Sequence, residues 1–268
     1  MGIGSSDLDL LIRLRNAGCL EPPCAVVEVG ARQLSNHFFD NERLSEVARL
    51  FGADPAGIPA LGRAASDRHG PQDLPSDAPL ARGFWEWLGL RYAAIDIDGS
   101  PNSIPLDLNY DRAPKSARGA YHLVTNFGTT EHVANQLNAF EIIHDLAMPG
   151  GIMIHNLPTQ GNSSHGLVNY NMKFFWMLAR SNQYEWLFLD YMHDGNHHGL
   201  RQDILDSVAQ YAPDIAERAA EIAISDDSIL VAFRKVKDFA FIAPLDVNSG
   251  AKAPNSAIAR RYWTVFGG

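Results

Sequence analysis

The sequence predicts an α/β protein built on a mostly parallel sheet with helices on both faces. Short apolar strands alternate with amphipathic helical segments along the 268 residues, and no internal repeat interrupts this alternation. Hydrophobic residues make up 46% of the chain and charged residues 20%, which is ordinary for a globular domain. A helix between two strands lets them pair in parallel, because it returns the chain across the sheet.

The expected helices carry apolar residues at helical spacing. They cover residues 6–17, 41–51, 80–90, 130–146 and 174–181. The expected strands are short runs rich in branched and aromatic side chains. They cover residues 24–29, 91–97, 103–108, 121–126, 152–154, 184–191 and 228–233. Residues 52–79 are dense in glycine, proline, aspartate and alanine, so we expect an irregular segment there.

Charge and composition narrow the classes of partner. The formal net charge is −9, whereas general binding to DNA or RNA needs a basic surface. We therefore expect a small-molecule partner and no nucleic acid. No apolar run approaches the ~18 residues of a membrane-spanning helix, so no membrane association is expected.

The two cysteines, Cys19 and Cys24, suggest neither a metal pair nor a disulfide framework. Reduced thiols in the cytoplasm are the expectation. The first residues lack the basic start and apolar core of a signal peptide, which agrees with that location.

Candidate ligand-binding residues follow the strands, because parallel sheets bind ligands beyond the carboxyl ends of their strands. Asp96 and Asp98 follow the second strand, where a carboxylate can accept hydrogen bonds from the two hydroxyls of a ribose. Asp107, in the next loop, is placed to accept from an adenine amino group. The phosphate-binding pattern GxxxxGK[ST] is absent, and Gly30 alone is a weak case for a pyrophosphate-binding turn.

Five sequence blocks occur in an order that resembles the class I S-adenosylmethionine-dependent methyltransferases. They are VVEVGA, YAAIDID, IPLDLN, YHLVTNFGTTEHV and LAMPGGIMIH. The resemblance covers about Cys24 to Phe233 and is most specific in TTEHV and the later PGG turn. It implies a Rossmann-like sheet of seven strands with an antiparallel last strand, S-adenosylmethionine as cofactor, and methyl transfer as the activity.

The resemblance also assigns cofactor contacts. Glu28 and Gly30 correspond to the acid and glycine beside the methionine part of the cofactor, and Gln33 belongs to the same loop. The acid after the second strand corresponds to Asp96 or Asp98, the adenine-loop acid to Asp107, and the residue after the fourth strand to Asn126. The loop departs from the family because Ala31, Arg32 and Gln33 replace its further glycines.

Methyl transfer to oxygen or nitrogen needs alignment of donor and acceptor, and a base near neutrality suits it. His155, at the end of the fifth strand, and His165, in the following polar loop, are the candidate catalytic residues. Each also has an ordinary alternative, a buried hydrogen-bonded histidine or a loop residue. Glu131 is expected to serve a helix N-terminus beside His132.

The chain divides into a methyltransferase-like domain over residues 1–235 and a C-terminal extension over 236–268. The extension is expected to pack on the domain or on a partner subunit, so a homodimer is an open alternative. Residues 34–90 form an insertion that predicts a lid, with a surface addition or a dimer contact as alternatives.

The stretch MHDGNHHGL, with His193, Asp194, His197 and His198, is the one metal-like cluster in the sequence. Gly195 and Asn196 favour a loop after the sixth strand, so no metal is expected. Two other functions stay open: a methyltransferase-like protein that binds without turnover, and a nicotinamide-dependent oxidoreductase. The missing GxGxxG disfavours the second.

Overall fold

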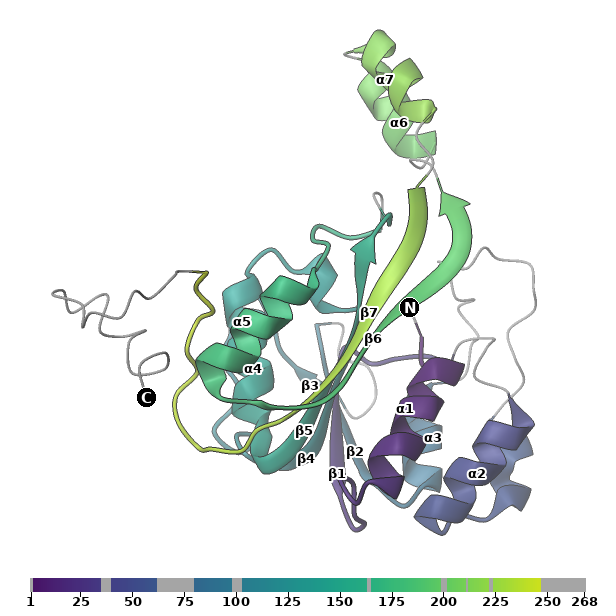
Figure 1. Cartoon of the computed structure of the whole chain (residues 1–268), viewed down its shortest axis with the longest axis vertical. Coiled ribbons are helices and arrows are strands. Elements are labelled where there is room, and N and C mark those ends of the chain that lie inside the picture. The colour runs from purple at the N-terminus through teal and green to yellow at the C-terminus, as the bar shows by residue number, and fades with distance from the viewer. Residues whose placement is uncertain are drawn as a thin grey trace, which may run out of the picture.

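A single seven-stranded sheet forms the centre of the protein, as the computed structural model shows (Figure 1). Its strands lie in the order β3-β2-β1-β4-β5-β7-β6. The structure describes residues 2–34, 40–61, 80–97, 103–162, 165–198, 202–210, 212–221 and 224–246.

The strands pair as the sequence predicts. They are β1 (Ala25–Val29), β2 (Arg91–Asp96), β3 (Ser103–Pro105), β4 (Tyr121–Phe127), β5 (Ala147–Gln160), β6 (Glu185–His198) and β7 (Ile224–Arg234). The pairs from β3 to β5 are parallel, and β7 runs antiparallel to both of its neighbours. This topology confirms the class I methyltransferase fold, including its antiparallel last strand.

One face of the sheet is covered by α1 (Ser5–Asn16), α2 (Asn41–Phe51) and α3 (Ala81–Trp87), seen together on one side of Figure 1. Leu44 of α2 and Trp85 of α3 are fully buried in the same hydrophobic cluster as the side chains of α1. Both helices of the segment 34–90 therefore belong to the core. A short 3-10 helix, η2 (Pro55–Leu61), follows α2. Residues 62–79 lie outside the described residues, and the lid stays a prediction.

The other face is covered by α4 (Gln136–Leu146) and α5 (Met172–Asn182). The chain after β7 crosses these helices. Asn182 donates to the carbonyl of Ile242 at 2.9 Å and accepts from its N–H at 2.8 Å. The described part of the C-terminal extension thus packs on its own domain. Residues 247–268 lie outside the described residues.

Several predicted elements begin or end elsewhere, and the strands expected over 152–154 and 184–191 extend to 147–160 and 185–198. The helix expected over 130–146 is a 3-10 turn, η3 (Thr130–His132), followed by α4, because the side chain of Asn135 caps α4 by accepting from the N–H of Asn138 at 3.2 Å. The strand expected over 103–108 ends at Pro105, since Asp107 turns the chain by accepting from the N–H of Asn109 at 2.8 Å.

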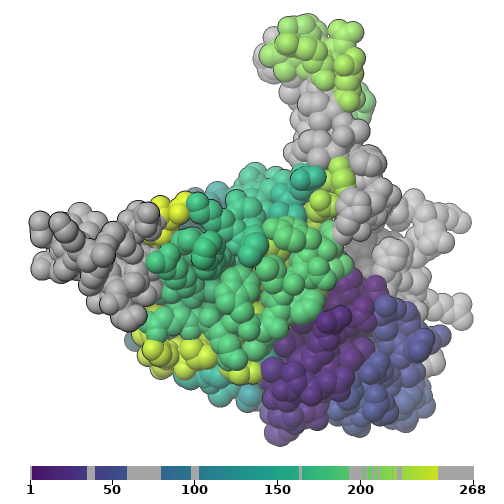
Figure 2. All heavy atoms as spheres, viewed as in Figure 1, coloured from purple at the N-terminus to yellow at the C-terminus, as the bar shows by residue number. Residues whose placement is uncertain are grey.

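Strands β6 and β7 extend beyond the body of the sheet and carry two helices that the sequence did not predict, α6 (Gln202–Ala209) and α7 (Pro213–Ala220). Figure 2 shows this helical pair projecting from the rest of the molecule. The loop expected over residues 193–198 is instead strand, in which His193 pairs with Asp227 and His197 with Ser225 across an irregularity in the register. No described helix is long and apolar enough to cross a membrane.

Candidate functional site

The loops after β1, β2 and β4 meet at the carboxyl edge of the sheet. The N–H of Gly30 donates to the carbonyl of Ile95 at 2.7 Å, which continues the β1–β2 pairing by one residue. The next N–H, that of Ala31, donates to Oδ2 of Asp96 at 2.8 Å. The loop after β1 is therefore tied to the acid that ends β2.

Gly30 is the point of closest approach between these loops. Its φ of +83° is disfavoured for residues with a side chain. A Cβ at this position would lie 2.4 Å from Oγ1 of Thr129, in the loop after β4. Only glycine fits this position without a shift of neighbouring atoms. Ala31, Arg32 and Gln33 follow it, so Gly30 is the one glycine of this turn.

Glu28 supports the same loop from the α1–α3 side of the sheet. Its buried carboxylate accepts from Nε1–H of Trp85 at 2.8 Å, from the hydroxyl of Tyr92 at 2.9 Å and from the N–H of Arg32 at 3.2 Å. Burial raises the pKa of Glu28, and these hydrogen bonds oppose that shift. Its oxygens are engaged with protein donors, so Glu28 orders the loop. A direct contact with the cofactor stays a prediction.

The remaining predicted cofactor residues are distributed along the edge. Ile97, directly after Asp96, is 74% exposed. One carboxylate oxygen of Asp107 accepts a hydrogen bond from the N–H of Asn109 at 2.8 Å. Gln33 forms an antiparallel bridge with Leu80. Asp98 lies outside the described residues.

Asn126 and His155 lie in the core of the protein and not at the carboxyl edge of the sheet. Asn126 is fully buried and its amide donates to Oγ1 of Thr130 at 2.9 Å. The ring of His155 lies 3.2 Å from this amide and packs among Phe140, Phe175 and other aromatic residues of the α4–α5 face. Burial lowers the pKa of His155 to about 3. The structure thus agrees with the alternative that the sequence left open for His155, a buried hydrogen-bonded histidine, because the strand register turns its side chain into the core.

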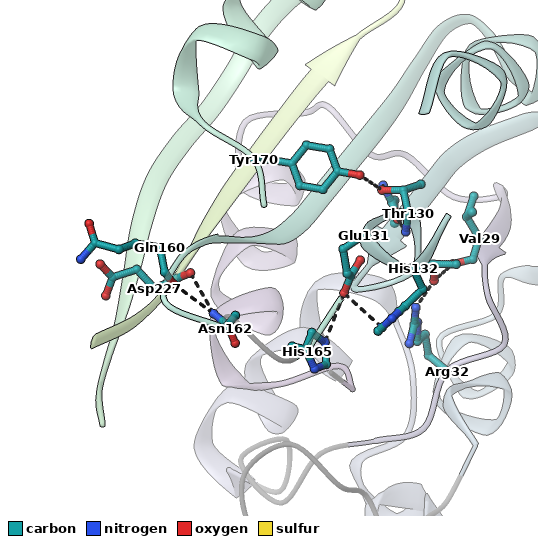
Figure 3. A network of polar contacts seen from close by, with 12 residues as sticks. Val29, Arg32, Thr130, Glu131, His132, Gln160, Asn162, His165, Tyr170 and Asp227 are labelled. Carbon is teal, nitrogen blue, oxygen red and sulfur yellow. Dashed lines mark hydrogen bonds and ion pairs between the residues drawn. The ribbon is translucent and has the colours of Figure 1, made fainter. Parts of the chain in front are cut away.

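Glu131, His132 and His165 form the polar cluster of the edge, which we call the Glu–His cluster (Figure 3). Oε1 of Glu131 lies 3.4 Å from Nε2 of His165 and 3.8 Å from Nε2 of His132. The two imidazole rings meet edge to face, with centroids 4.9 Å apart. The sequence suggested that Glu131 serves a helix N-terminus, but Asn135 caps α4, and Glu131 lies fully buried in η3.

The electrostatics of the cluster involve Arg32, which lies beside Glu131 in Figure 3 and also contacts the side chain of Thr129. Burial is the largest influence on Glu131 and acts to raise its pKa. His165 and the charge of Arg32 outweigh it, so the pKa lies below its usual range. Burial lowers the pKa of His132. Glu131 is thus ionised and His132 neutral near neutrality.

A backbone contact brings His165 to Glu131. The N–H groups of Leu167 and Val168 donate to the carbonyl of Glu131 at 2.7 and 3.1 Å. A Cβ on Gly166 would lie 2.8 Å from Cγ of Glu131, so this glycine permits the close approach. Sequence reasoning selected His165 but missed its partner, because no spacing rule connects loops from two different strands. The glycine after His165 was the one available signal.

Comparisons with known proteins find similarity in structure only. No family profile matches the chain, and no curated protein matches it. A SAM-dependent methyltransferase from Archaeoglobus fulgidus is 11% identical, over 85% of this chain and 94% of its own, with a TM-score of 0.40. The 1,6-didemethyltoxoflavin-N1-methyltransferase of Burkholderia thailandensis is also 11% identical, over 86% of this chain and 78% of its own, with a TM-score of 0.37.

Proposed function

We propose that the protein is an S-adenosylmethionine-dependent methyltransferase that acts on an oxygen or nitrogen of a small molecule. One observation carries the proposal. The acid that ends β2, Asp96, accepts a hydrogen bond from the loop after β1, and Arg32 of that loop interacts electrostatically with both Asp96 and Glu131 of the Glu–His cluster. A nucleoside-binding acid and a polar cluster for the acceptor are then neighbours at the carboxyl edge, where parallel sheets bind ligands.

The residues present fit the cofactor. A carboxylate at the end of β2 suits the ribose hydroxyls, and Ile97, 74% exposed directly after it, offers an apolar contact for a purine face. We assign Asp107, in the neighbouring loop, to accept a hydrogen bond from the adenine amino group. The loop after β1 has Ala31, Arg32 and Gln33 where a pyrophosphate-binding turn has further glycines, and S-adenosylmethionine has no pyrophosphate. This last feature favours the methyltransferase over the nicotinamide-dependent oxidoreductase.

In the proposed reaction, a lone pair on the acceptor atom forms a bond to the methyl carbon. The carbon–sulfur bond breaks, and its electron pair stays on sulfur to give S-adenosylhomocysteine. The acceptor loses its proton. The work of the protein is to align the two reactants and to help that proton leave. The Glu–His cluster is the part of the edge suited to the second task. We assign His165 to the acceptor side, and His155 to the core.

Calorimetry with S-adenosylmethionine, S-adenosylhomocysteine and NAD tests the proposal. The wild-type protein is expected to bind the two sulfur nucleotides and not NAD. Asp96→Asn should weaken that binding by about tenfold or more, since hydrogen bonds to a charged group contribute about 1.5–3 kcal/mol. Asp190→Asn, an exposed aspartate of β6, is the matched control and should bind as wild type. Binding of NAD alone would replace the proposal with the oxidoreductase, and binding of none of the three would end it.

A further inference from the structure

Three metal-ligating side chains converge in the Glu–His cluster. A carboxylate oxygen of Glu131 and one ring nitrogen each of His132 and His165 all lie within 4.8 Å of one another. They come from two loops, those after β4 and β5, which the hydrogen bonds from Leu167 and Val168 to the carbonyl of Glu131 hold together. The backbone, and not a chance side-chain rotamer, therefore brings these residues into one place.

The separations are close to those of a ligand set. Two atoms each ~2.1 Å from a metal lie about 3.0–3.4 Å apart at octahedral or tetrahedral angles. Oε1 of Glu131 and Nε2 of His165 are 3.4 Å apart, and Nε2 of His132 is 3.8 Å from the same oxygen. Most of the adjustment falls to His132, whose side chain is 48% exposed and has room to move.

Hydrogen bonding leaves the same atoms unsatisfied. Both carboxylate oxygens of Glu131 and Nε2 of His165 are buried, and none of the three has a hydrogen-bond partner in the part of the chain that the structure describes. The side chain of Glu131 has no exposed surface at all. Buried polar atoms are rarely left without hydrogen bonds. One cation bound between these atoms would satisfy all three.

The positive charge of Arg32 is shared at this edge. Its guanidinium interacts electrostatically with Glu131, Glu28 and Asp96. Glu131 is therefore one of several carboxyl groups that face the same positive charge.

We propose that Glu131, His132 and His165 bind a divalent transition-metal ion. Two imidazoles and one carboxylate favour ions such as Zn²⁺, Co²⁺, Fe²⁺ or Mn²⁺ over Mg²⁺ and Ca²⁺, which prefer oxygen ligands alone. Three protein ligands leave at least one coordination position open, as in catalytic metal sites.

The open position gives the metal a role that rests on the proposed function. An acceptor hydroxyl bound there becomes more acidic and loses its proton to solvent. Its oxygen then forms the bond to the methyl carbon, and the electrons of the broken carbon–sulfur bond stay on sulfur. The substrate class is thus a molecule with a hydroxyl group able to reach the metal. The two imidazoles serve as ligands in this scheme and do not take the proton.

The test is a titration of the untagged full-length protein with Co²⁺ after dialysis against a chelator, followed by calorimetry and by the visible absorption of the ion. One equivalent is expected to bind. Glu131→Gln and His165→Gln should each weaken binding by at least about tenfold, since even residues that only support metal ligands contribute that much. His122→Gln, a histidine at the amino end of β4, is the matched control and should bind as wild type.

Two outcomes would overturn the inference. One is the absence of binding by the wild-type protein to Co²⁺, Zn²⁺ and Mn²⁺. The other is binding that persists in Glu131→Gln but disappears in His197→Gln, which would place the ion at β6. His132→Gln, at a half-exposed position, tests the site even if Glu131→Gln fails to fold, and it too should weaken binding. Cofactor binding is measured separately, so a failure of this inference is distinct from a failure of the proposed function.

Discussion

The indole Nε1–H of Trp85 donates a 2.8 Å hydrogen bond to the buried carboxylate of Glu28. This bond joins the end of β1 to α3, which belongs to the insertion over residues 34–90 that the sequence had suggested as a lid. The helix is thereby a support for the loop after β1, since the same carboxylate accepts from the N–H of Arg32 within that loop.

Trp85→Phe should therefore destabilise the protein while preserving most of its packing. It leaves Oε1 of Glu28 buried without this donor, which costs about 1–3 kcal/mol of the free energy of unfolding. Urea denaturation measures the change. Trp176→Phe is the matched control, because Trp176 is 52% exposed and should change stability little. Equal effects of the two substitutions would show that the bond to Glu28 is unimportant.

Gly30→Ala should destabilise the protein more than Gly89→Ala does. Both glycines have positive φ, +83° and +79°, so each substitution carries a similar backbone strain. A Cβ at Gly89 meets nothing within 4 Å, whereas at Gly30 it lies 2.4 Å from Oγ1 of Thr129. We expect an additional loss of about 1–3 kcal/mol for Gly30→Ala in thermal or urea unfolding.

The same excess should shrink in a Thr129→Ala background, because that substitution removes Oγ1 and Cγ2 of Thr129, two of the three atoms nearest to the new Cβ. A double-mutant cycle measures this coupling. An excess that is unchanged in the double mutant would place the strain in the backbone alone.

Asp7 should make the protein less stable as the pH rises. Burial raises the pKa of this carboxyl from 3.8 to about 6, against hydrogen bonds from Gly4 and Asn156. The folded state thus binds the proton more tightly than the unfolded state does. The contribution of Asp7 to stability is complete below pH 3.8 and is lost as the pH rises through about 6.

Asp7→Asn should remove this pH dependence, which amounts to about 3 kcal/mol for a shift of this size. The new amide can donate to Oδ1 of Asn156, which has no hydrogen-bond partner among the described residues. Unfolding by urea at pH 4 and pH 7 measures the effect, with Asp9→Asn, a 45% exposed neighbour on α1, as control. Identical pH profiles for wild type and Asp7→Asn would contradict the prediction.

His155 should have the opposite dependence. Burial lowers its pKa from 6.5 to about 3, so the folded state resists protonation. Stability from this group is complete above pH 6.5 and is lost as the pH falls toward 3. In His155→Phe the amide of Asn126 loses an acceptor, which should cost about 1–3 kcal/mol near neutrality. The difference in the free energy of unfolding between His155→Phe and wild type should decrease as the pH falls. A difference that is independent of pH would contradict a neutral buried imidazole.

Hydrophobic periodicity was enough to predict the sheet and most of its helices, because β1, β4 and β5 are buried on both faces and read as apolar runs. It missed α6 and α7, short helices at the tip of a projecting ribbon. Periodicity also could not predict which face of the sheet each strand residue occupies. His155 and Asn156 are adjacent in sequence, yet one packs among aromatic rings on the α4–α5 side and the other donates to Asp7 of α1 at 3.0 Å.

The site could be predicted only in part, for a related reason. Strand ends are visible in a sequence, so Asp96 and the edge around it could be named. The meeting of Glu131 with His165 depends on how two loops hydrogen-bond to each other, and each loop alone resembles an ordinary turn.

The support given to the loop after β1 by Glu28, Asp96 and Thr129 has a consequence for how such chains vary. Most nucleotide loops encode their shape in their own glycines. Here the shape depends on the side chains of Glu28, Asp96 and Thr129. The loop can therefore contain Ala31, Arg32 and Gln33 in place of glycines, while the three supporting residues are the ones that cannot vary. Relatives that preserve this loop are then to be sought by the pattern of those distant supports, and a search for a run of glycines overlooks them.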